Sequence, residues 1–275
     1  MQASNYQWKG ADGVELYGKE WSVDRPEAIV LLVHGMGEHC ERYEPLAEFL
    51  TAHKINLVSY DQRGHGHTAG KRGHAPSAQK LYEDLAIFQK KIAQKYADIP
   101  LFLYGHSMGG NVVLNYTLQY KPAIKGVIAT GPWIRLSMEP PKALVMIGKV
   151  LRSILPGVQQ DTKLDANNIS TIKSEVEKYK NDPLNHGKIT FAMGIDTTNA
   201  AAFLDQYAGD FPAPLLIMHG GDDPITSKDA SKEFADRITS DVTFREWPHN
   251  YHEIHNDVNR KEVFEEILAW IKKKM

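Results

Sequence analysis

The stretch Tyr104-Gly105-His106-Ser107-Met108-Gly109-Gly110 decides the fold, because it places the pattern G-x-S-x-G between two different kinds of element. The apolar run 101–103 before it predicts a buried strand, and residues 111–116 after it begin a helical pattern. This context is typical of a nucleophile elbow, a sharp turn that holds a strained serine with its hydroxyl exposed. We therefore expect Ser107 to be a nucleophile, with Gly105 and Gly109 leaving room where a Cβ would clash.

Length and composition exclude several classes of protein. A chain of 275 residues, 42% of them hydrophobic, can bury a large core as one α/β unit. A net charge of -2 gives no electrostatic basis for binding nucleic acid. The start of the chain has no basic segment followed by an apolar one, and no apolar run approaches the roughly 20 residues of a membrane span. The single cysteine, Cys40, cannot form an internal disulfide, so we expect a cytoplasmic protein.

Most of the chain predicts strands that alternate with helices. Residues 6–22 hold two alternating runs around Ala11-Asp12-Gly13, which is typical of a hairpin. Continuous apolar runs followed by helical spacing favour an α/β fold with a mostly parallel central sheet and helices on both faces. Buried strands are expected at 28–33, 55–60, 101–103, 126–130, 214–220 and 242–247, and helices near 43–52, 77–97, 228–238 and 259–272.

The alternation stops at Gly131-Pro132. Residues 134–211 carry no clear central strand; they hold an apolar helical segment from Ala143 to Leu155 and a polar helix near 170–180. We interpret 134–211 as a mainly helical cap inserted after the sixth strand. The core is then formed by residues 1–133 and 212–275.

A serine hydroxyl needs a base, usually a histidine that a carboxylate orients. In an open parallel sheet these groups lie in loops that follow the strands. The chain order Ser, Asp, His is the order expected for such a site, but spacing alone leaves the choice within each cluster open. The candidates are Asp222 and Asp223 after the strand at 214–220, and His249, His252 and His255 after the strand at 242–247.

The three histidines also form H-x-x-H-x-x-H, which raises the question of a metal ion. This spacing lacks the i, i+4 pair that puts two ligands on one helix face, and no matching ligand set appears elsewhere, so we expect no metal and no cofactor. An oxyanion needs backbone donors instead. We expect these to be the N–H groups of Met108, which follows the nucleophile, and of Met36, in the loop after the first central strand.

Seven motifs together resemble the monoacylglycerol lipase and lysophospholipase branch of the α/β-hydrolase superfamily. They follow one another over nearly the whole chain, and H-G-x-G-E-H with R-Y, together with N-D-P-L, is far narrower than the elbow alone. The motifs are H-G-M-G-E-H (34–39), R-Y (42–43), D-Q-R-G-H-G (61–66), G-H-S-M-G-G (105–110), N-D-P-L (181–184), G-G-D-D-P (220–224) and Y-H-E-I-H (251–255).

The resemblance implies an α/β-hydrolase fold and a serine hydrolase that converts monoacylglycerol to glycerol and fatty acid through an acyl-enzyme. It assigns Asp223 and His252 as the partners of Ser107, and Met36 and Met108 as the oxyanion donors. Two residues depart from the family pattern: His249 stands where glycine is frequent, and Met36 where a smaller residue is common. Glu38 is expected to support the oxyanion loop or to bind a polar head group.

Other functions remain open at this stage. One alternative is a general carboxylesterase for small esters, and another is a lysophospholipase. A third alternative, from a different functional class, is a non-catalytic ligand-binding module on the same fold. No sequence feature demands an oligomer, and Cys40 is expected to be buried and inert.

The cap bears on the substrate. In the segment 143–155 apolar residues cover more than one helical stripe, beside the cations Lys142, Lys149 and Arg152. Such a helix either meets an acyl chain or, transiently, a membrane surface, or it packs on the core. The residues expected to contact a small lipid or ester substrate are Glu38, His106, Leu144, Ile147 and Leu151.

Overall fold

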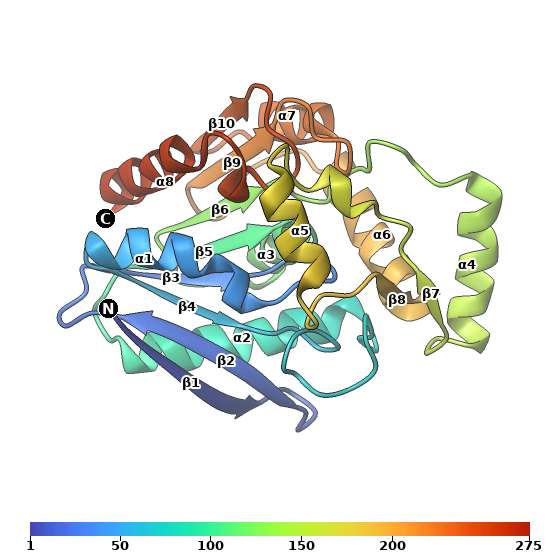
Figure 1. Cartoon of the computed structure of the whole chain (residues 1–275), viewed down its shortest axis with the longest axis horizontal. Helices are drawn as coiled ribbons and strands as arrows, with labels where there is room; N and C mark the ends of the chain where they lie inside the picture. The colour runs from blue at the N-terminus through green and yellow to red at the C-terminus, as the bar shows by residue number, and fades with distance from the viewer.

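The computed structural model describes residues 1–275, apart from the side chain of Lys142. An eight-stranded sheet crosses it in the order β1-β2-β4-β3-β5-β6-β9-β10 (Figure 1). β1 and β2 are antiparallel and β2 pairs antiparallel with β4, but every other neighbouring pair is parallel, so the predicted mostly parallel sheet is confirmed. The strands are β1 (Gln2–Lys9), β2 (Glu15–Ser22), β3 (Ala28–Val33), β4 (Ile55–Tyr60), β5 (Leu101–His106), β6 (Gly126–Thr130), β9 (Leu215–Gly220) and β10 (Val242–Trp247).

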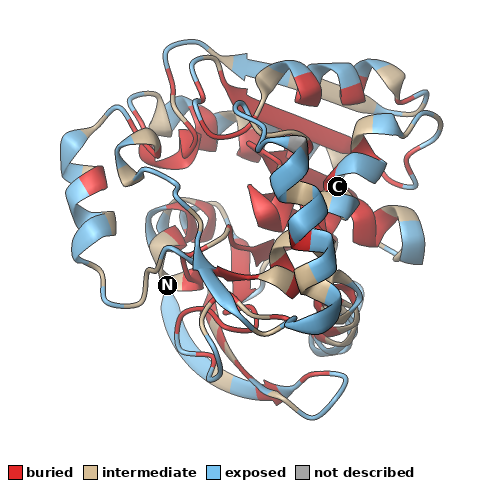
Figure 2. Ribbon diagram, turned by 90° about the vertical axis from the view of Figure 1, so that its right-hand side faces the viewer, coloured by how far each residue is buried: buried red, intermediate tan, exposed pale blue. Residues whose placement is uncertain are grey.

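Helices cover both faces of the sheet, as predicted. Every residue of β3 is buried, and alternate residues belong to two separate clusters, with Ile29 and Leu31 in one and Val30 and Leu32 in the other. Each buried side chain of this size stabilises the fold by roughly 1.5–3 kcal/mol, and Figure 2 shows this burial concentrated in the strands. The first cluster includes α2 (Ala78–Lys95), α3 (Met108–Tyr120) and α7 (Lys228–Arg237), and the second includes α1 (Glu44–Ala52) and α8 (Arg260–Lys274).

The segment between β6 and β9 lies outside the main sheet. Its elements are α4 (Lys142–Ile154), β7 (Gln159–Asp161), α5 (Lys173–Asn181), β8 (Lys188–Thr190) and α6 (Phe191–Gln206). Sequence reading missed the short β7–β8 ribbon and expected only short helical pieces where α6 stands. α6 packs against α2, α3, α4 and α7, so its apolar residues are not confined to one stripe (Figure 1).

The chain order places two loops side by side at the centre of the sheet. β4 and β5 follow β3 in the sequence but pair on opposite sides of it. A crevice therefore opens at the carboxyl ends of β3 and β5, which is where ligands bind in open α/β sheets. The loop after β3 and the turn at Ser107 both lie there.

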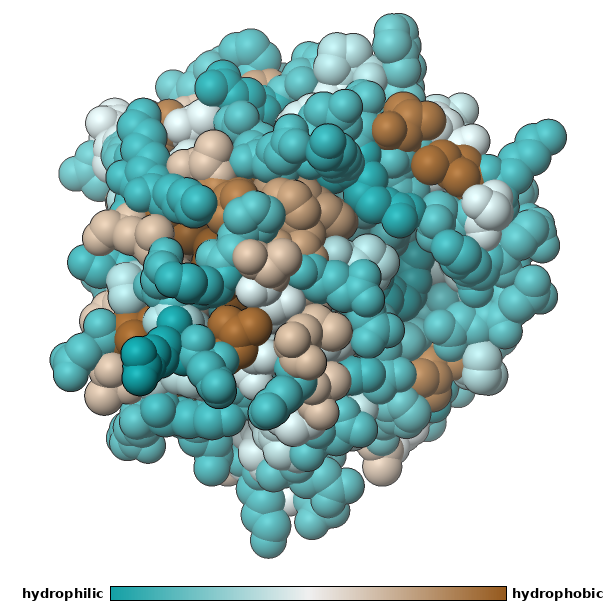
Figure 3. All heavy atoms as spheres, turned by 60° about the vertical axis from the view of Figure 1, so that its left-hand side comes forward, coloured by the Kyte–Doolittle hydropathy of each residue, from teal (hydrophilic) through white to brown (hydrophobic). Residues whose placement is uncertain are grey.

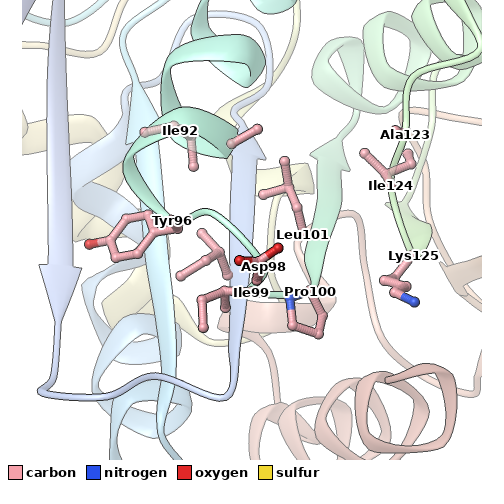
Figure 4. A pocket seen from close by; sticks show the side chains of 11 residues that line it. Ile92, Tyr96, Asp98, Ile99, Pro100, Leu101, Ala123, Ile124 and Lys125 are labelled. Carbon is pink, nitrogen blue, oxygen red and sulfur yellow. The ribbon is translucent and has the colours of Figure 1, made fainter.

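A larger hollow of about 510 Å³ lies at the opposite end of the sheet. Figure 4 shows its mainly apolar lining, which includes Ile92, Tyr96, Leu101 and Ile124. The parallel strands begin here rather than end, so the loops that carry reacting groups in this class of fold are on the other side of the molecule.

Exposed large apolar side chains are most frequent on α4, and much of the remaining surface is polar. The face in Figure 3 is mostly hydrophilic, with separate apolar side chains rather than one large patch. Within the described part of the chain, none of the helices has the length and hydropathy of a membrane span.

Candidate active site

Ser107 stands at a strained turn between β5 and α3, as the elbow pattern predicts. Its φ of 54° and ψ of -117° lie in a region that non-glycine residues rarely adopt. A Cβ on Gly105 would lie 2.3 Å from the carbonyl oxygen of Gly109, and a Cβ on Gly109 would lie 2.0 Å from that of Val33. Both glycines are therefore required by the close packing of strand and helix around the turn.

Ser107 and His252 line the same cavity, which has a volume of about 190 Å³. The Nδ1 atom of His252 lies 2.7 Å from Oδ2 of Asp223, and the imidazole is almost completely buried. Burial alone lowers the pKa of His252, but the charge and hydrogen bond of Asp223 outweigh it and raise the pKa above its ordinary value. A base so oriented beside a strained serine is the arrangement of a serine nucleophile.

Asp223 is held by backbone and side-chain donors. The N–H groups of Ile225 and Thr226 donate to Oδ1 at 2.7 and 3.1 Å, and the Thr226 hydroxyl donates to Oδ2 at 2.8 Å. Burial raises the pKa of this carboxyl, yet the charge on His252 and the hydrogen bonds from His219 and His252 hold the pKa well below its usual range. Asp223 is thus fixed as an acceptor toward His252.

The other residues of the two clusters take no part in the contact between His252 and Asp223. His249 and Asp222 lie 3.4 Å from each other with side chains that are 89% and 57% exposed. His255 is buried and stacks on Tyr43 with ring centroids 4.8 Å apart, and burial lowers its pKa to about 4. The geometry therefore favours Asp223 over Asp222. It also favours His252 over His249 and His255.

Glu38 holds the loop that follows β3. Its Oε1 accepts from the N–H of Gly35 at 2.6 Å and from the hydroxyl of Tyr43 at 2.8 Å, while Arg42 donates to Oε2 at 2.7 Å. Arg42 also forms two 2.7 Å bonds with Glu253, beside His252. Glu38 supports the loop and lines the cavity as well, so both roles expected of it are compatible with its position.

The two residues expected to donate to an oxyanion lie on either side of Ser107. Met36 lines the cavity from the loop after β3. Met108 is the first residue of α3, where an N–H has no partner within the helix. Both residues follow shortly after the ends of β3 and β5, at the crevice described above.

His106 also lines the cavity, and its ring contacts Thr130. Its Nδ1 lies 3.0 Å from the carbonyl oxygen of Thr130, which can only accept, so Nδ1 carries the hydrogen. Burial lowers the pKa of His106 well below its ordinary value, and nearby His252 and His255 lower it further. A neutral His106 therefore contributes no charge to the cavity.

The expectation that Leu144, Ile147 and Leu151 contact the substrate is not supported by this arrangement. They lie on α4, outside the set of residues that line the cavity, and Leu144 and Ile147 are more than half exposed. The helix turns a different side toward the molecule, as described below. The apolar lining that sequence reasoning missed comes from Leu164, Ile169 and Ile225.

Sequence reasoning also missed the contacts between α5 and the oxyanion loop. The carbonyl oxygen of Gly37 accepts from the N–H of His186 at 2.9 Å and from the Tyr179 hydroxyl at 3.3 Å. His39 lies 2.8 Å from Asp182 of the N-D-P-L motif. The N-D-P-L motif marks Asp182 in the sequence. Its spacing does not show which distant residue Asp182 contacts.

Among the described residues, no group of three or more His, Cys, Asp or Glu side chains is arranged to hold a metal ion. The members of H-x-x-H-x-x-H point to different places, because His249 is exposed, His252 faces Asp223 and His255 stacks on Tyr43.

The sequence is similar to one protein family and to several individual proteins. The profile of the family described as serine aminopeptidase, S33, matches residues 24–259. An abhydrolase domain-containing protein of Dictyostelium discoideum is 36% identical; the match covers 91% of this chain but only 27% of that protein. The monoacylglycerol lipase of Mycolicibacterium smegmatis is 31% identical over 98% of this chain and 96% of its own length. The phospholipase YtpA of Bacillus subtilis is 31% identical over 91% and 97%.

Two solved structures are similar over almost their whole length. The monoacylglycerol lipase of Paleococcus ferrophilus is 31% identical with a TM-score of 0.86, covering 94% of this chain and 99% of its own. A soluble variant of the monoglyceride lipase of Saccharomyces cerevisiae, in complex with a substrate analogue, is 28% identical with a TM-score of 0.86, covering 100% and 95%.

Proposed function

This chain belongs to the family described as serine aminopeptidase, S33, within the α/β-hydrolase superfamily, and from that premise we propose that it hydrolyses monoacylglycerols to glycerol and free fatty acid. The observation that carries the proposal is the strained Ser107 in one cavity with a buried His252 that is bonded to Asp223. The monoacylglycerol lipases of similar sequence and structure support the choice of substrate.

The reaction proceeds through an acyl-enzyme. His252 takes the proton of Ser107 as Oγ attacks the ester carbonyl, and Asp223 orients the imidazole and stabilises its charged form. The N–H groups of Met36 and Met108 bind the tetrahedral oxyanion. His252 then protonates the leaving alcohol and later activates a water molecule that releases the fatty acid.

The raised pKa of His252 predicts the acid side of the pH profile. His252 has to be unprotonated to act as a base, so kcat/KM is expected to fall as pH drops through a pKa above the usual histidine value of about 6.5. Rates of p-nitrophenyl butyrate hydrolysis between pH 5 and pH 9 measure this limb, with the spontaneous rate subtracted at each pH. An acid limb with a pKa below about 6 contradicts the assignment of His252 as a base that Asp223 stabilises.

The charges around the cavity favour a neutral head group. Its lining includes the carboxylates of Glu38, Asp165 and Glu253 but neither lysine nor arginine among the described residues. Arg42 is bonded to Glu38 and Glu253 from outside this lining, so the lining offers a phosphate no free cation, whereas its carboxylate oxygens can accept hydrogen bonds from the hydroxyls of glycerol. This argues for monoacylglycerol over lysophospholipid, although the phospholipase of Bacillus subtilis at 31% identity keeps the lysophospholipase as the second candidate.

The cavity volume bears on the acyl chain. At about 190 Å³ it is below the 300–1,000 Å³ of a usual ligand pocket, so a long chain needs residues 134–211 to move. We propose that these residues form a cap over a core made of 1–133 and 212–275. The general carboxylesterase alternative requires no such movement, because a short ester fits the closed cavity.

Three substrates separate these alternatives. We expect 1-monooleoylglycerol to be hydrolysed with a higher kcat/KM than 1-oleoyl-lysophosphatidylcholine or p-nitrophenyl butyrate. Turnover of the butyrate ester alone contradicts the monoacylglycerol proposal and favours a small-ester carboxylesterase. Preference for the lysophospholipid favours the second candidate. Binding of all three without turnover favours the non-catalytic module.

We propose further that α4 contacts a membrane surface transiently. The helix packs on α6 through its Gly148 side, where an added Cβ would lie 2.8 Å from Ile195, and Arg152 forms two 2.9 Å bonds with Asp196. The helix lies at the edge of the molecule (Figure 1), and its apolar stripe is on the exposed side. Met146, Val150 and Ile154 at i, i+4 and i+8 are 69%, 58% and 68% exposed. The side chain of Lys142, one of the cations expected beside this stripe, lies outside the described residues.

Replacing Met146, Val150 and Ile154 together by glutamine is expected to weaken vesicle binding by at least about tenfold, because their apolar surface no longer enters the interface. Sedimentation with vesicles of phosphatidylcholine and phosphatidylglycerol measures the loss. Val258→Gln, at a residue of similar exposure elsewhere, is the matched control. Equal sedimentation of wild type and triple variant contradicts the proposed contact, and hydrolysis of p-nitrophenyl butyrate should stay unchanged in both variants.

We also propose a cytoplasmic location. The support is Cys40, a free and buried cysteine in a chain with no second cysteine to pair with. Such a thiol fits a reducing compartment.

A further inference from the structure

A second buried histidine, His219, lies against Asp223 in addition to His252. His219 is the next-to-last residue of β9 and is fully buried. Its Nε2 lies 3.0 Å from Oδ2 of Asp223 and 3.0 Å from the carbonyl oxygen of Thr226. Its Nδ1 lies 2.9 Å from the hydroxyl of Ser231 on α7. The two imidazoles thus approach the same carboxylate oxygen.

The neighbours of His219 determine where its hydrogen lies. A carbonyl oxygen and a carboxylate only accept, so Nε2 must carry a hydrogen; it is donated to the Thr226 carbonyl oxygen, with Oδ2 of Asp223 3.0 Å from the same nitrogen. The Ser231 hydroxyl completes the bonding of the ring at Nδ1. Both nitrogens of the buried imidazole therefore have partners, and the N–H of Nε2 lies beside the carboxylate that contacts His252.

We propose that His219 is a positioning residue for the reaction: it holds Oδ2 of Asp223 in line with Nδ1 of His252, and Ser231 holds His219. The proposal rests on the proposed hydrolytic function of Ser107. The contacts run in a chain from Ser231 through His219 and Asp223 to His252. Only Asp223 and His252 belong to the expected catalytic set.

The geometry explains why one more donor matters at Oδ2. The Oδ1 atom is fixed by two backbone N–H groups, which cannot turn. The Oδ2 atom faces three side chains, His252 at 2.7 Å, Thr226 at 2.8 Å and His219 at 3.0 Å. The Thr226 hydroxyl also lies 3.1 Å from the carbonyl oxygen of Gly131 and has a single hydrogen to donate. His219 therefore places a further N–H group 3.0 Å from Oδ2, on a ring whose orientation Thr226 and Ser231 fix.

Packing alone does not account for a histidine at this position. Residues 215–218 of β9 are apolar and fully buried, and a further apolar residue would fill the same space without a polar ring to satisfy. A histidine here requires Ser231, Thr226 and Asp223 as partners. Its presence is explained by what it does to the carboxylate.

Two variants of equal length test the proposal. The amide nitrogen of glutamine reaches the position of Nε2, so His219→Gln keeps the donor, while His219→Met keeps the volume and removes it. We expect His219→Met to lower kcat for p-nitrophenyl butyrate by about 10–100-fold with little change in KM, and to displace the acid limb of the pH profile. We expect His219→Gln to stay within about threefold of wild type with the limb in place.

Two results overturn the proposal. One is a His219→Met enzyme that stays within about threefold of wild type with an unchanged acid limb. The other is an equal loss in both variants with the limb in place, which indicates a structural role only. If His219→Met does not fold, Ser231→Ala gives the test, since it removes the Nδ1 partner without touching the carboxylate: a displaced limb supports the proposal and an unchanged rate and limb overturn it. Failure to hydrolyse monooleoylglycerol leaves this comparison intact, because its readout is the butyrate ester.

Discussion

Replacing His252 by alanine is expected to lower kcat by about 10⁶-fold, as much as removing the whole catalytic group in enzymes of this type. The reason is that neither His106 nor His255, the two neighbouring imidazoles, is hydrogen-bonded to a carboxylate that would stabilise its charged form, and burial lowers the pKa of both below the ordinary value. Initial rates of p-nitrophenyl butyrate hydrolysis measure the loss.

The matched control is His249→Ala, three residues away in the sequence. The His249 side chain is 89% exposed and faces Asp222, so this variant is expected to keep most of the activity. The reverse result, with His249 essential and His252 dispensable, contradicts the assignment. Thermal unfolding of both variants separates loss of the base from loss of the fold.

Replacing Asp223 by asparagine is expected to lower kcat by about 10⁴-fold while leaving the fold intact. An amide nitrogen facing Nδ1 of His252 is a donor where an acceptor is needed, so the imidazole takes the wrong tautomer and its Nε2 can no longer accept the Ser107 proton. The 2.7 Å distance between Asp223 and His252 makes this effect direct. The same rate assay measures it.

Asp222→Asn is the control for this substitution, because it replaces a carboxylate oxygen by an amide nitrogen in the neighbouring residue. Its side chain is 57% exposed and directed toward His249, so we expect the rate to change by less than about threefold. Equal losses in the two variants contradict the choice of Asp223 as the residue that orients the base.

The sheet and the elbow could be predicted from the sequence because both depend on local pattern. Continuous apolar runs such as 28–33 lie in strands buried on both faces, and the glycines around Ser107 are required by contacts of 2.0 to 2.3 Å that a Cβ would make. The short strands β7 and β8 could not be predicted, since three residues are too few for a period to appear.

The proposed partners of Ser107 could be predicted only in part from the residues alone. Chain order restricted the acid and the base to two clusters, but selecting Asp223 and His252 took a resemblance, because residues one or three positions apart differ only in how the loop turns. His249, for example, has a φ of 63°, and its side chain is exposed to solvent. The choice depends on backbone conformation, which spacing does not contain.

Contacts between distant segments were not predictable. Arg42 bonds to Glu253 across 211 residues of sequence, and His219 reads as the polar end of an apolar strand until the turn after β9 brings Asp223 beside it. The orientation of α4 is a similar case. From the sequence alone, its apolar stripe is equally compatible with a buried face. The packing of Gly148 on α6 and the exposure of the apolar side chains show that the stripe points outward.

The most direct test of the account is the release of oleate from 1-monooleoylglycerol by the purified protein beside its Ser107→Ala variant. The account predicts strong release by the wild type and none above the blank by the variant, with both proteins showing the same thermal unfolding. Release that persists in Ser107→Ala contradicts the role of the elbow serine, and no release by either protein contradicts the proposed substrate.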